Sequence, residues 1–286
     1  CDSRLRVFRN DTNLGLAASL NRALEKASAP VAARMDADDL SRPGRFATQL
    51  RTLEERKADI VFCRCRMFGH ESGKEWLWKE LPAGERQWRN LFSNYYGPHP
   101  TAMFRADYIR GLGGYDPAVK RGQDYDLWDR AQAAGARFAY SAFVGLDYRC
   151  HPQAVSSLFS ADQFETGKLV SLRALARAFP DASFAERTGL HALMFPKANF
   201  LEDAAQEAVS HILERVTEFI RDQLTGEAKQ DTWRIWRDVA EHLASRARKA
   251  GPNMKWRLQA AALRSAANSR SLRTLARALV RCYLAP

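Results

Sequence analysis

The spacing of apolar residues changes near residue 155, and this change limits the folds open to the chain. Before it, segments with strand-like patterns alternate with segments of helical spacing. We expect strands at 4–9, 31–35, 59–68, 102–105 and 137–149, and helices at 16–27, 43–53 and 124–134. Strands that alternate with helices predict an α/β domain with a mostly parallel sheet.

After residue 155 the strand patterns give way to helical periodicity. It runs through roughly 161–179, 200–224, 229–249, 254–267 and 270–284, with breaks at Pro180, Gly226 and Pro252. A chain of 286 residues with 46% hydrophobic residues can bury one core and a helical appendage. We therefore predict a domain at 1–157 and an α-helical, basic region at 158–286.

The formal net charge is +11, and the ten Lys and Arg residues after Glu241 are accompanied by no acidic residue. Such a tail should attract polyanions. Residues 255–283 have the pattern of a basic amphipathic helix, which can lie on an anionic membrane surface. The alternative is a solvated basic face on a helical bundle. No aromatic and basic stripe is present, so no nucleic-acid partner is expected.

The five cysteines are scattered and odd in number, which favours a reduced, cytosolic setting. We expect Cys63 and Cys65 to be buried thiols on one face of a strand. The sequence has no run of 18 apolar residues, so the expected location is cytoplasmic, with peripheral contact to the inner membrane face. Because Cys1 begins within an expected strand, we interpret the chain as truncated at its N-terminus.

Three aspartates, Asp36, Asp38 and Asp39, directly follow the expected strand at 31–35. Ligands of open α/β sheets bind beyond the carboxyl ends of strands. Carboxylates in such a turn can bind Mg²⁺ or Mn²⁺, with phosphate oxygens and water as further ligands. The alternative is a helix-capping loop, but capping requires only one acidic residue, and three would repel one another.

A second acidic pair, Asp124 and Asp126, lies at the start of a predicted helix, where the helix dipole favours ionised carboxylates. A carboxylate in this position can act as a general base. The alternative is helix capping by Asp124, with Trp128 in the core. Upstream, His99 lies between two prolines, either as part of an acceptor site or as a simple turn residue.

Six segments together resemble the family 2 glycosyltransferases of the GT-A fold. They are Asn13-Leu14-Gly15-Leu16 with Asn21, Ala33-Arg34-Met35-Asp36-Ala37-Asp38-Asp39, His99-Pro100-Thr101-Ala102-Met103-Phe104-Arg105, Gly113-Gly114-Tyr115-Asp116, Gln123-Asp124-Tyr125-Asp126-Leu127-Trp128 and Tyr148-Arg149-Cys150-His151-Pro152. The resemblance covers residues 4–155. Two features depart from the family pattern: the first strand and its loop would precede Arg4, and Gln123 stands where the family usually has Glu.

The resemblance also implies roles for individual residues. Asp124 would be the catalytic base, and Arg149 would reach a phosphate. The metal would be held by Asp38, Asp39 and His151; the nucleotide sugar by Asn13, Gly15, Asn21, Arg34 and Asp36; and the acceptor side would include His99, Asp126 and Trp128.

The implied activity is that of an inverting, hexosyltransferase-type enzyme that uses Mg²⁺ or Mn²⁺. It would move a sugar from a nucleotide diphosphate to a hydroxyl of a saccharide or lipid-linked saccharide, in cell-surface polysaccharide or glycolipid synthesis. A nucleotidyltransferase would need a glycine-rich phosphate loop, which the sequence lacks. A basic nucleic-acid-binding protein and a non-catalytic remnant of an enzyme are the two competing interpretations of the chain.

Overall fold

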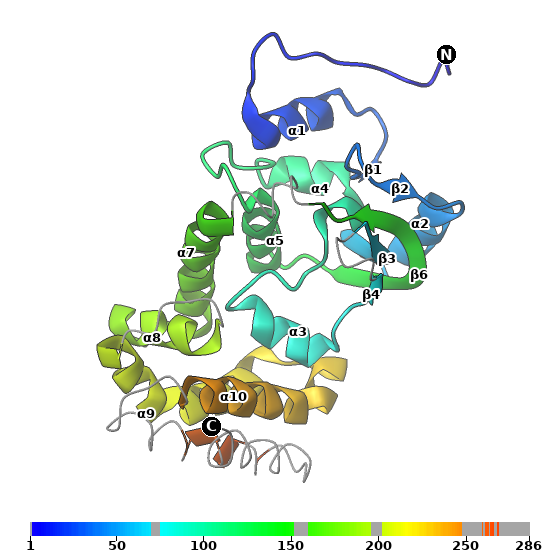
Figure 1. Cartoon of the computed structure of the whole chain (residues 1–286). Helices are drawn as coiled ribbons and strands as arrows, with labels where there is room; N and C mark the ends of the chain where they lie inside the picture. Colours follow the sequence, from blue (N-terminus) through cyan, green and yellow to red (C-terminus); the bar gives the residue numbers. More distant parts are fainter. Residues whose placement is uncertain are drawn as a thin grey trace. The chain divides into compact units, whose positions relative to one another are not determined.

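The computed structural model describes residues 2–69, 75–151, 160–195 and 202–247, together with 259, 261, 262, 264, 265 and 268. The chain forms two compact units (Figure 1). The first comprises Cys1–Glu80 and Tyr96–Gly167, and the second Leu81–Tyr95 and Lys168–Pro286. The division predicted at residue 157 assigns 81–95 to the N-terminal domain, whereas the structure groups this segment with the C-terminal helices.

A six-stranded sheet forms the centre of the first unit. Its strands are β1 (Val31–Ala33), β2 (Leu40–Ser41), β3 (Ile60–Phe68), β4 (Trp76–Trp78), β5 (Ala102–Arg105) and β6 (Phe138–Arg149). The order is β1-β5-β3-β6-β2, with β4 paired to β3. The predicted α/β class is confirmed, but among the described strands only β3 and β6 pair in parallel. The expectation of a mostly parallel sheet is wrong in this respect, because alternation reveals a strand but not its direction.

Helices pack around this sheet in the first unit. They are α1 (Gly15–Lys26), α2 (Arg45–Glu55), the 3₁₀ turn η1 (His99–Thr101), α4 (Ala106–Gly111) and α5 (Gln123–Ala133). The helix α7 (Ser160–Ala178) begins in the first unit and continues into the second. Ile60, Phe62 and Leu127 are fully buried, as the apolar patterns of their segments predict.

The buried face of α2 differs from the one that apolar spacing predicts. Leu53 is fully buried, but Phe46 and Leu50 are 53% and 39% exposed. Arg45 and Gln49 are buried in their place. Ser41 lies in β2, paired with Leu146 of β6, and α2 begins at Arg45, two residues after the predicted start at 43.

The segment 4–9, expected as a strand, is exposed and has no regular secondary structure (Figure 1). None of the sheet pairings found in the described residues includes it, and alternation without a partner strand does not form a sheet. The expectation for the thiols is confirmed: Cys63 and Cys65 are buried and free.

The second unit is helical, as predicted for the C-terminal region. It contains α3 (Ala83–Asn90), α8 (Phe184–Met194), α9 (Glu202–Glu218), η2 (Phe219–Gln223), η3 (Gly226–Asp231) and α10 (Thr232–Ala247). The helix α8 is not anticipated by the sequence patterns. The core of this unit includes Trp88, Leu190, Ile212, Val239 and Leu243.

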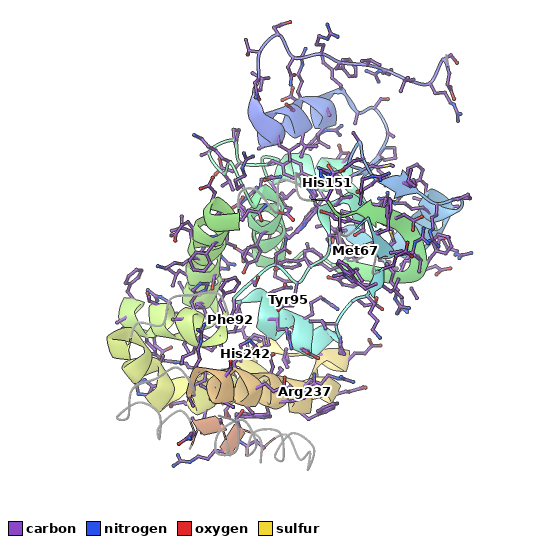
Figure 2. All side chains as sticks on the ribbon, in the orientation of Figure 1. Met67, Phe92, Tyr95, His151, Arg237 and His242 are labelled. Atoms are coloured by element: carbon purple, nitrogen blue, oxygen red, sulfur yellow. The ribbon has the colours of Figure 1, made fainter. Side chains whose placement is uncertain are left out.

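Ion pairs explain why residues 81–95 belong to the second unit. Arg89 of α3 pairs with Asp238 of α10 at 2.6 Å, and Arg237 pairs back to Glu85 at 3.4 Å. Figure 2 labels Arg237 and His242 on α10.

No helix in the described part of the chain has both the length and the apolar character needed to cross a bilayer. The predicted helices at 254–267 and 270–284 lie largely outside the described residues.

Candidate active site

The loop after β1 begins with a buried arginine. The Arg34 backbone N–H donates to the carbonyl oxygen of Ala102 at 2.9 Å, which fixes the loop to the start of β5. The Arg34 side chain is 5% exposed and forms an ion pair with Asp36, which is 39% exposed. Asp36 is therefore accessible to a ligand, and Arg34 supplies positive charge behind it.

Asp38 and His151 meet although 113 residues separate them. One Asp38 carboxylate oxygen lies 3.1 Å from His151 Nε2, and both side chains are partly exposed. His151 follows the end of β6, as Figure 2 shows. The antiparallel pairing of β2 with β6 explains this contact. Leu40 lies opposite Asp147, so the residues that precede Leu40 approach the residues that follow Asp147, and Asp38 comes close to His151.

Asp39 points into the protein, in contrast to Asp38. Its side chain is buried, and Oδ1 accepts a hydrogen bond from the Arg149 backbone N–H at 2.9 Å. Burial raises the pKa of Asp39 to about 6, and the negative charges of Asp36 and Asp38 also raise it. The Arg149 guanidinium donates through Nε to the backbone oxygen of Asp38 at 3.0 Å. Asp39 and Arg149 thus hold the loop in place.

The predicted metal set is only partly assembled. Within the described residues, no group of three or more His, Cys, Asp or Glu side chains is arranged to hold a metal ion. Asp38 and His151 converge, whereas the buried Asp39 carboxylate faces a backbone N–H. Mg²⁺ commonly binds through one or two carboxylates together with substrate phosphates, and imidazole is also a metal ligand. Asp38 and His151 therefore fit a divalent ion that a substrate helps to hold. Asp39 Oδ1 is occupied by the Arg149 N–H while Oδ2 is buried without a hydrogen-bond partner, so the metal role of Asp39 stays a prediction.

A second group of side chains lies around Tyr115. His99 Nε2 and the Tyr115 hydroxyl share a hydrogen bond of 2.8 Å, and both side chains are buried. Burial and the positive charge of Arg34 hold the pKa of His99 well below its usual value. Burial raises the pKa of Tyr115, and the negative charge of Asp124 raises it further. The buried His99–Tyr115 pair therefore lies within the electrostatic influence of both Arg34 and Asp124.

Asn21 fixes the backbone of Tyr115. Its amide nitrogen donates to the Tyr115 carbonyl at 2.7 Å, and its amide oxygen accepts from the Tyr115 N–H at 2.8 Å. A side chain at Gly114 would meet the Asn21 oxygen at 2.4 Å, and Gly114 has a φ of +68°, so a glycine is required there. Asn13 and Gly15, predicted with Asn21 to bind the donor, contact each other at the exposed start of α1.

Two residues expected on the acceptor side are buried. Asp126 accepts from Arg130 Nε at 2.9 Å, and Arg130 also donates to the carbonyl oxygens of Leu112 and Gly114. Trp128 is fully buried, with its ring centroid 6.0 Å from that of His99. Both residues therefore support the elements that carry the site, and their contact with an acceptor stays a prediction.

Sequence reasoning gives no role to Tyr115, which joins the two halves of the site. The only signal is its place in the segment Gly113-Gly114-Tyr115-Asp116. The loop carrying Asp36 and Asp38 is linked through Arg34 to the group of His99, Tyr115 and Asp124. Such an arrangement can bind an anionic leaving group on one side and present a carboxylate to a proton donor on the other.

Comparison with known proteins agrees with this arrangement. The sequence model described as "Glycosyl transferase family 2" matches residues 1–113. The match includes Arg34, Asp36, Asp38 and His99, whereas Asp124 and His151 lie beyond it.

Curated relatives include several glycosyltransferases. An uncharacterized glycosyltransferase of Methanocaldococcus jannaschii is 31% identical over 153 residues, covering 52% of this chain and 51% of its own length. The amylovoran biosynthesis glycosyltransferase AmsE of Erwinia amylovora is 33% identical, covering 44% and 47%. The O-antigen biosynthesis glycosyltransferase WbnJ of Escherichia coli is 30% identical, covering 52% and 59%. The chain thus spans about half the length of the curated relatives it matches.

Proposed function

Because the sequence model of glycosyltransferase family 2 matches residues 1–113, we propose that this protein transfers a sugar from a nucleotide diphosphate to an acceptor hydroxyl, with inversion at the anomeric carbon. The observation that carries the proposal is the link from Asp36 through Arg34 to His99, Tyr115 and Asp124. It relates a loop that bears one arginine and three aspartates to a group near a candidate base.

The donor would bind at the loop after β1. Asp36 is exposed and can accept hydrogen bonds from the ribose hydroxyls, while its ion pair with Arg34 orients the carboxylate. The Arg34 guanidinium is nearly buried, so its charge is less screened than that of a surface arginine. This charge would help to stabilise the departing diphosphate.

Asp38 and His151 would hold Mg²⁺ or Mn²⁺ together with oxygens of the diphosphate. The ion, when bound, would supply positive charge that stabilises the leaving group. The 3.1 Å contact between Asp38 and His151 supports this assignment, and the partial exposure of both side chains leaves room for substrate ligands. Asp39 would support the loop through its bond to Arg149 and would not contact the ion.

Asp124 would remove the proton of the acceptor hydroxyl as that oxygen attacks the anomeric carbon. The bond to the diphosphate oxygen breaks in the same displacement, which inverts the configuration and requires no enzyme nucleophile. Asp124 lies in the first turn of α5, where the helix dipole favours the ionised carboxylate. The imidazole of His99 is a weaker proton acceptor than usual, because burial and the positive charge of Arg34 lower the pKa of His99.

The acceptor would be a saccharide or lipid-linked saccharide of a cell-surface polysaccharide or glycolipid. Two relatives support this class, since one is named for amylovoran biosynthesis and another for O-antigen biosynthesis. The enzyme would then work in the cytoplasm, at the inner face of the membrane. The basic tail after Glu241 supports such a location through its attraction to anionic lipids.

The first test is a panel of UDP-, GDP- and dTDP-sugars incubated with the full-length protein, with and without MnCl₂ or MgCl₂. Release of free nucleotide from one donor, abolished by EDTA, is the expected result. The anomeric configuration of the product, read by NMR with a simple acceptor, should be opposite to that of the donor. Absence of turnover with every donor contradicts the proposal, and retained configuration contradicts single displacement.

The proposed membrane contact has a separate test. Full-length protein should sediment with vesicles that contain phosphatidylglycerol but not with pure phosphatidylcholine vesicles, and about 0.5 M NaCl should reduce binding because salt screens the attraction. Equal binding to both vesicle types contradicts an electrostatic contact and leaves the transfer reaction unaffected.

A further inference from the structure

A polar pair lies in the interior of the first unit, on the face of α2 that packs on the sheet. Arg45 is 1% exposed, and Gln49, one helical turn later, is fully buried. Arg45 Nε donates to Gln49 Oε1 at 2.8 Å, so the two side chains act as one group. Neither residue belongs to the donor or acceptor side described above.

The pair binds backbone oxygens of two different segments. Arg45 Nη2 donates to the carbonyl of Arg34 at 2.9 Å and to that of Pro100 at 2.6 Å. Gln49 Nε2 donates to the carbonyl of Thr101 at 2.8 Å and to that of Val61 at 3.2 Å. One arginine nitrogen therefore joins the loop that carries Asp36 to the turn that carries His99.

The surrounding structure leaves space for this arginine. A side chain at Gly145 of β6 would come within 2.9 Å of Arg45 Cγ and within 2.8 Å of the Cys63 sulfur. Position 145 therefore requires a glycine, because the aliphatic part of the Arg45 side chain and the Cys63 thiol occupy the space that a larger side chain would need. A glycine within a strand often marks such a close approach.

Stability alone does not account for an arginine at this position. No ion pair joins Arg45 to a carboxylate of the described residues, and a buried cation without such a partner is costly. A leucine or methionine would avoid burying a charge but would leave the carbonyl oxygens of Arg34 and Pro100 without these donors. What arginine alone supplies is a rigid, planar set of donors that can bind two carbonyl oxygens at a fixed spacing.

We propose that Arg45 is a positioning residue for sugar transfer: it fixes the loop of Arg34 relative to the turn of His99, and so sets the separation of donor and acceptor. This inference rests on the transfer reaction proposed above. Gln49 supports it by orienting the Arg45 guanidinium. A misplacement of about 1 Å between reacting groups can cost about 10²-fold in rate.

The experiment compares Arg45→Lys with Leu53→Val in the full-length protein. Lysine keeps the charge and most of the stem but loses the two-carbonyl geometry. Leu53 is fully buried on the same helix and contacts the core, so its variant controls for destabilisation of α2. Three quantities are measured with the best donor of the panel: the melting temperature, kcat for transfer, and the rate of donor hydrolysis without acceptor.

Arg45→Lys should melt close to the wild type and lower kcat for transfer by about tenfold or more, with donor KM and donor hydrolysis changed by less than about threefold. The ratio of transfer to hydrolysis should be unchanged in Leu53→Val. The role of Arg45 is overturned if Arg45→Lys leaves the ratio of transfer to hydrolysis unchanged. It is also overturned if kcat for transfer falls in both variants in proportion to the decrease in melting temperature. If Arg45→Lys does not fold, the same three quantities are measured for Gln49→Met, and the same outcomes support or overturn the proposal.

Failure of this inference is distinguishable from failure of the proposed function. A wild-type protein that transfers sugar, with a ratio insensitive to Arg45 and Gln49, overturns only the positioning role. A wild-type protein that neither transfers nor hydrolyses any nucleotide sugar overturns the proposed function and this role together.

Discussion

His99 and Tyr115 share a buried hydrogen bond of 2.8 Å that connects the turn η1 to the segment preceding α5. Burial and the positive charge of Arg34 lower the pKa of His99, and burial and the negative charge of Asp124 raise the pKa of Tyr115. This single bond therefore joins the donor side of the site to the candidate base.

Tyr115→Phe removes the hydroxyl and leaves the buried Nε2 of His99 without its partner. We expect the free energy of unfolding to fall by about 1–3 kcal/mol, the cost of an unpaired buried polar group. Turnover should fall as well, because the turn that carries His99 loses its tie to α5. The measurements are denaturant unfolding and kcat with the best donor.

Tyr108→Phe is the matched control for this change. The Tyr108 hydroxyl is only partly buried and donates to the carbonyl oxygen of Ala131 at 3.3 Å, away from His99. Its removal should leave kcat unchanged. Equal effects of the two variants on kcat argue against a specific link through Tyr115.

Asp124→Asn should lower kcat by about 10²- to 10⁴-fold, the usual contribution of a general base. Donor binding should remain, since Asp124 is assigned to the acceptor side. Steady-state kinetics and calorimetric titration with the nucleotide diphosphate measure the two effects. Asp107→Asn is the control, because Asp107 is a highly exposed residue of α4 that pairs only locally with Arg110. Wild-type turnover in Asp124→Asn excludes it as the base.

Substitution of the loop aspartates tests the proposed metal assignment. Asp38→Ala should abolish activity that depends on Mn²⁺ or Mg²⁺, since Asp38 is the exposed carboxylate beside His151. Asp39→Asn should keep the same metal dependence, because an amide oxygen can still accept from the Arg149 N–H. Titration of activity with MnCl₂ measures both. If both variants lose the metal dependence equally, Asp39 is also a metal ligand and its assignment to the loop alone is wrong.

His191 should make the stability of the second unit depend on pH. It is buried in α8, stacked on Phe195, and Nδ1 lies 2.8 Å from the Ser171 hydroxyl. Burial lowers the pKa of His191 to about 4. The folded state therefore favours neutral His191, and its contribution is complete above about pH 6.5, the value for an unfolded histidine. It is lost as the pH falls from about 6.5 towards 4, by about 3 kcal/mol in total.

Denaturant unfolding of wild type and His191→Gln between about pH 7.5 and 4 measures this contribution. Glutamine can still donate to the Ser171 hydroxyl but does not titrate in this range. The difference in unfolding free energy between the two proteins should shift by about 3 kcal/mol across the window, with the wild type losing more. Parallel pH profiles contradict the assignment to His191.

Much of the site is predictable from residue order. Asp36 and Asp38 directly follow a strand, and Asp124 begins a helix, so local sequence places each at the end of its element. The helical C-terminal region also follows from periodicity, which is a property of neighbouring residues. Local patterns are sufficient wherever the physical cause acts over a few residues.

Residues whose roles depend on distant segments are predicted less well. The family resemblance places Asp39 at the metal, whereas its hydrogen bond from the Arg149 N–H, 110 residues away, could not be predicted from the sequence. Apolar spacing assigns Phe46 and Leu50 to the buried face of α2. That face is instead occupied by Arg45 and Gln49, which bind carbonyls up to 55 residues distant.

The sequence by itself determined which residues are candidates for the chemistry: the aspartates after β1 and the aspartate in the first turn of α5, together with the alternation of strands and helices that presents them. Only the tertiary structure decided which of these side chains meet. Strand pairing brings His151 to Asp38, and a buried hydrogen bond brings Tyr115 to His99. The physical reason is that propensity and periodicity act between near neighbours, whereas burial and hydrogen bonding act between whatever residues the fold brings together.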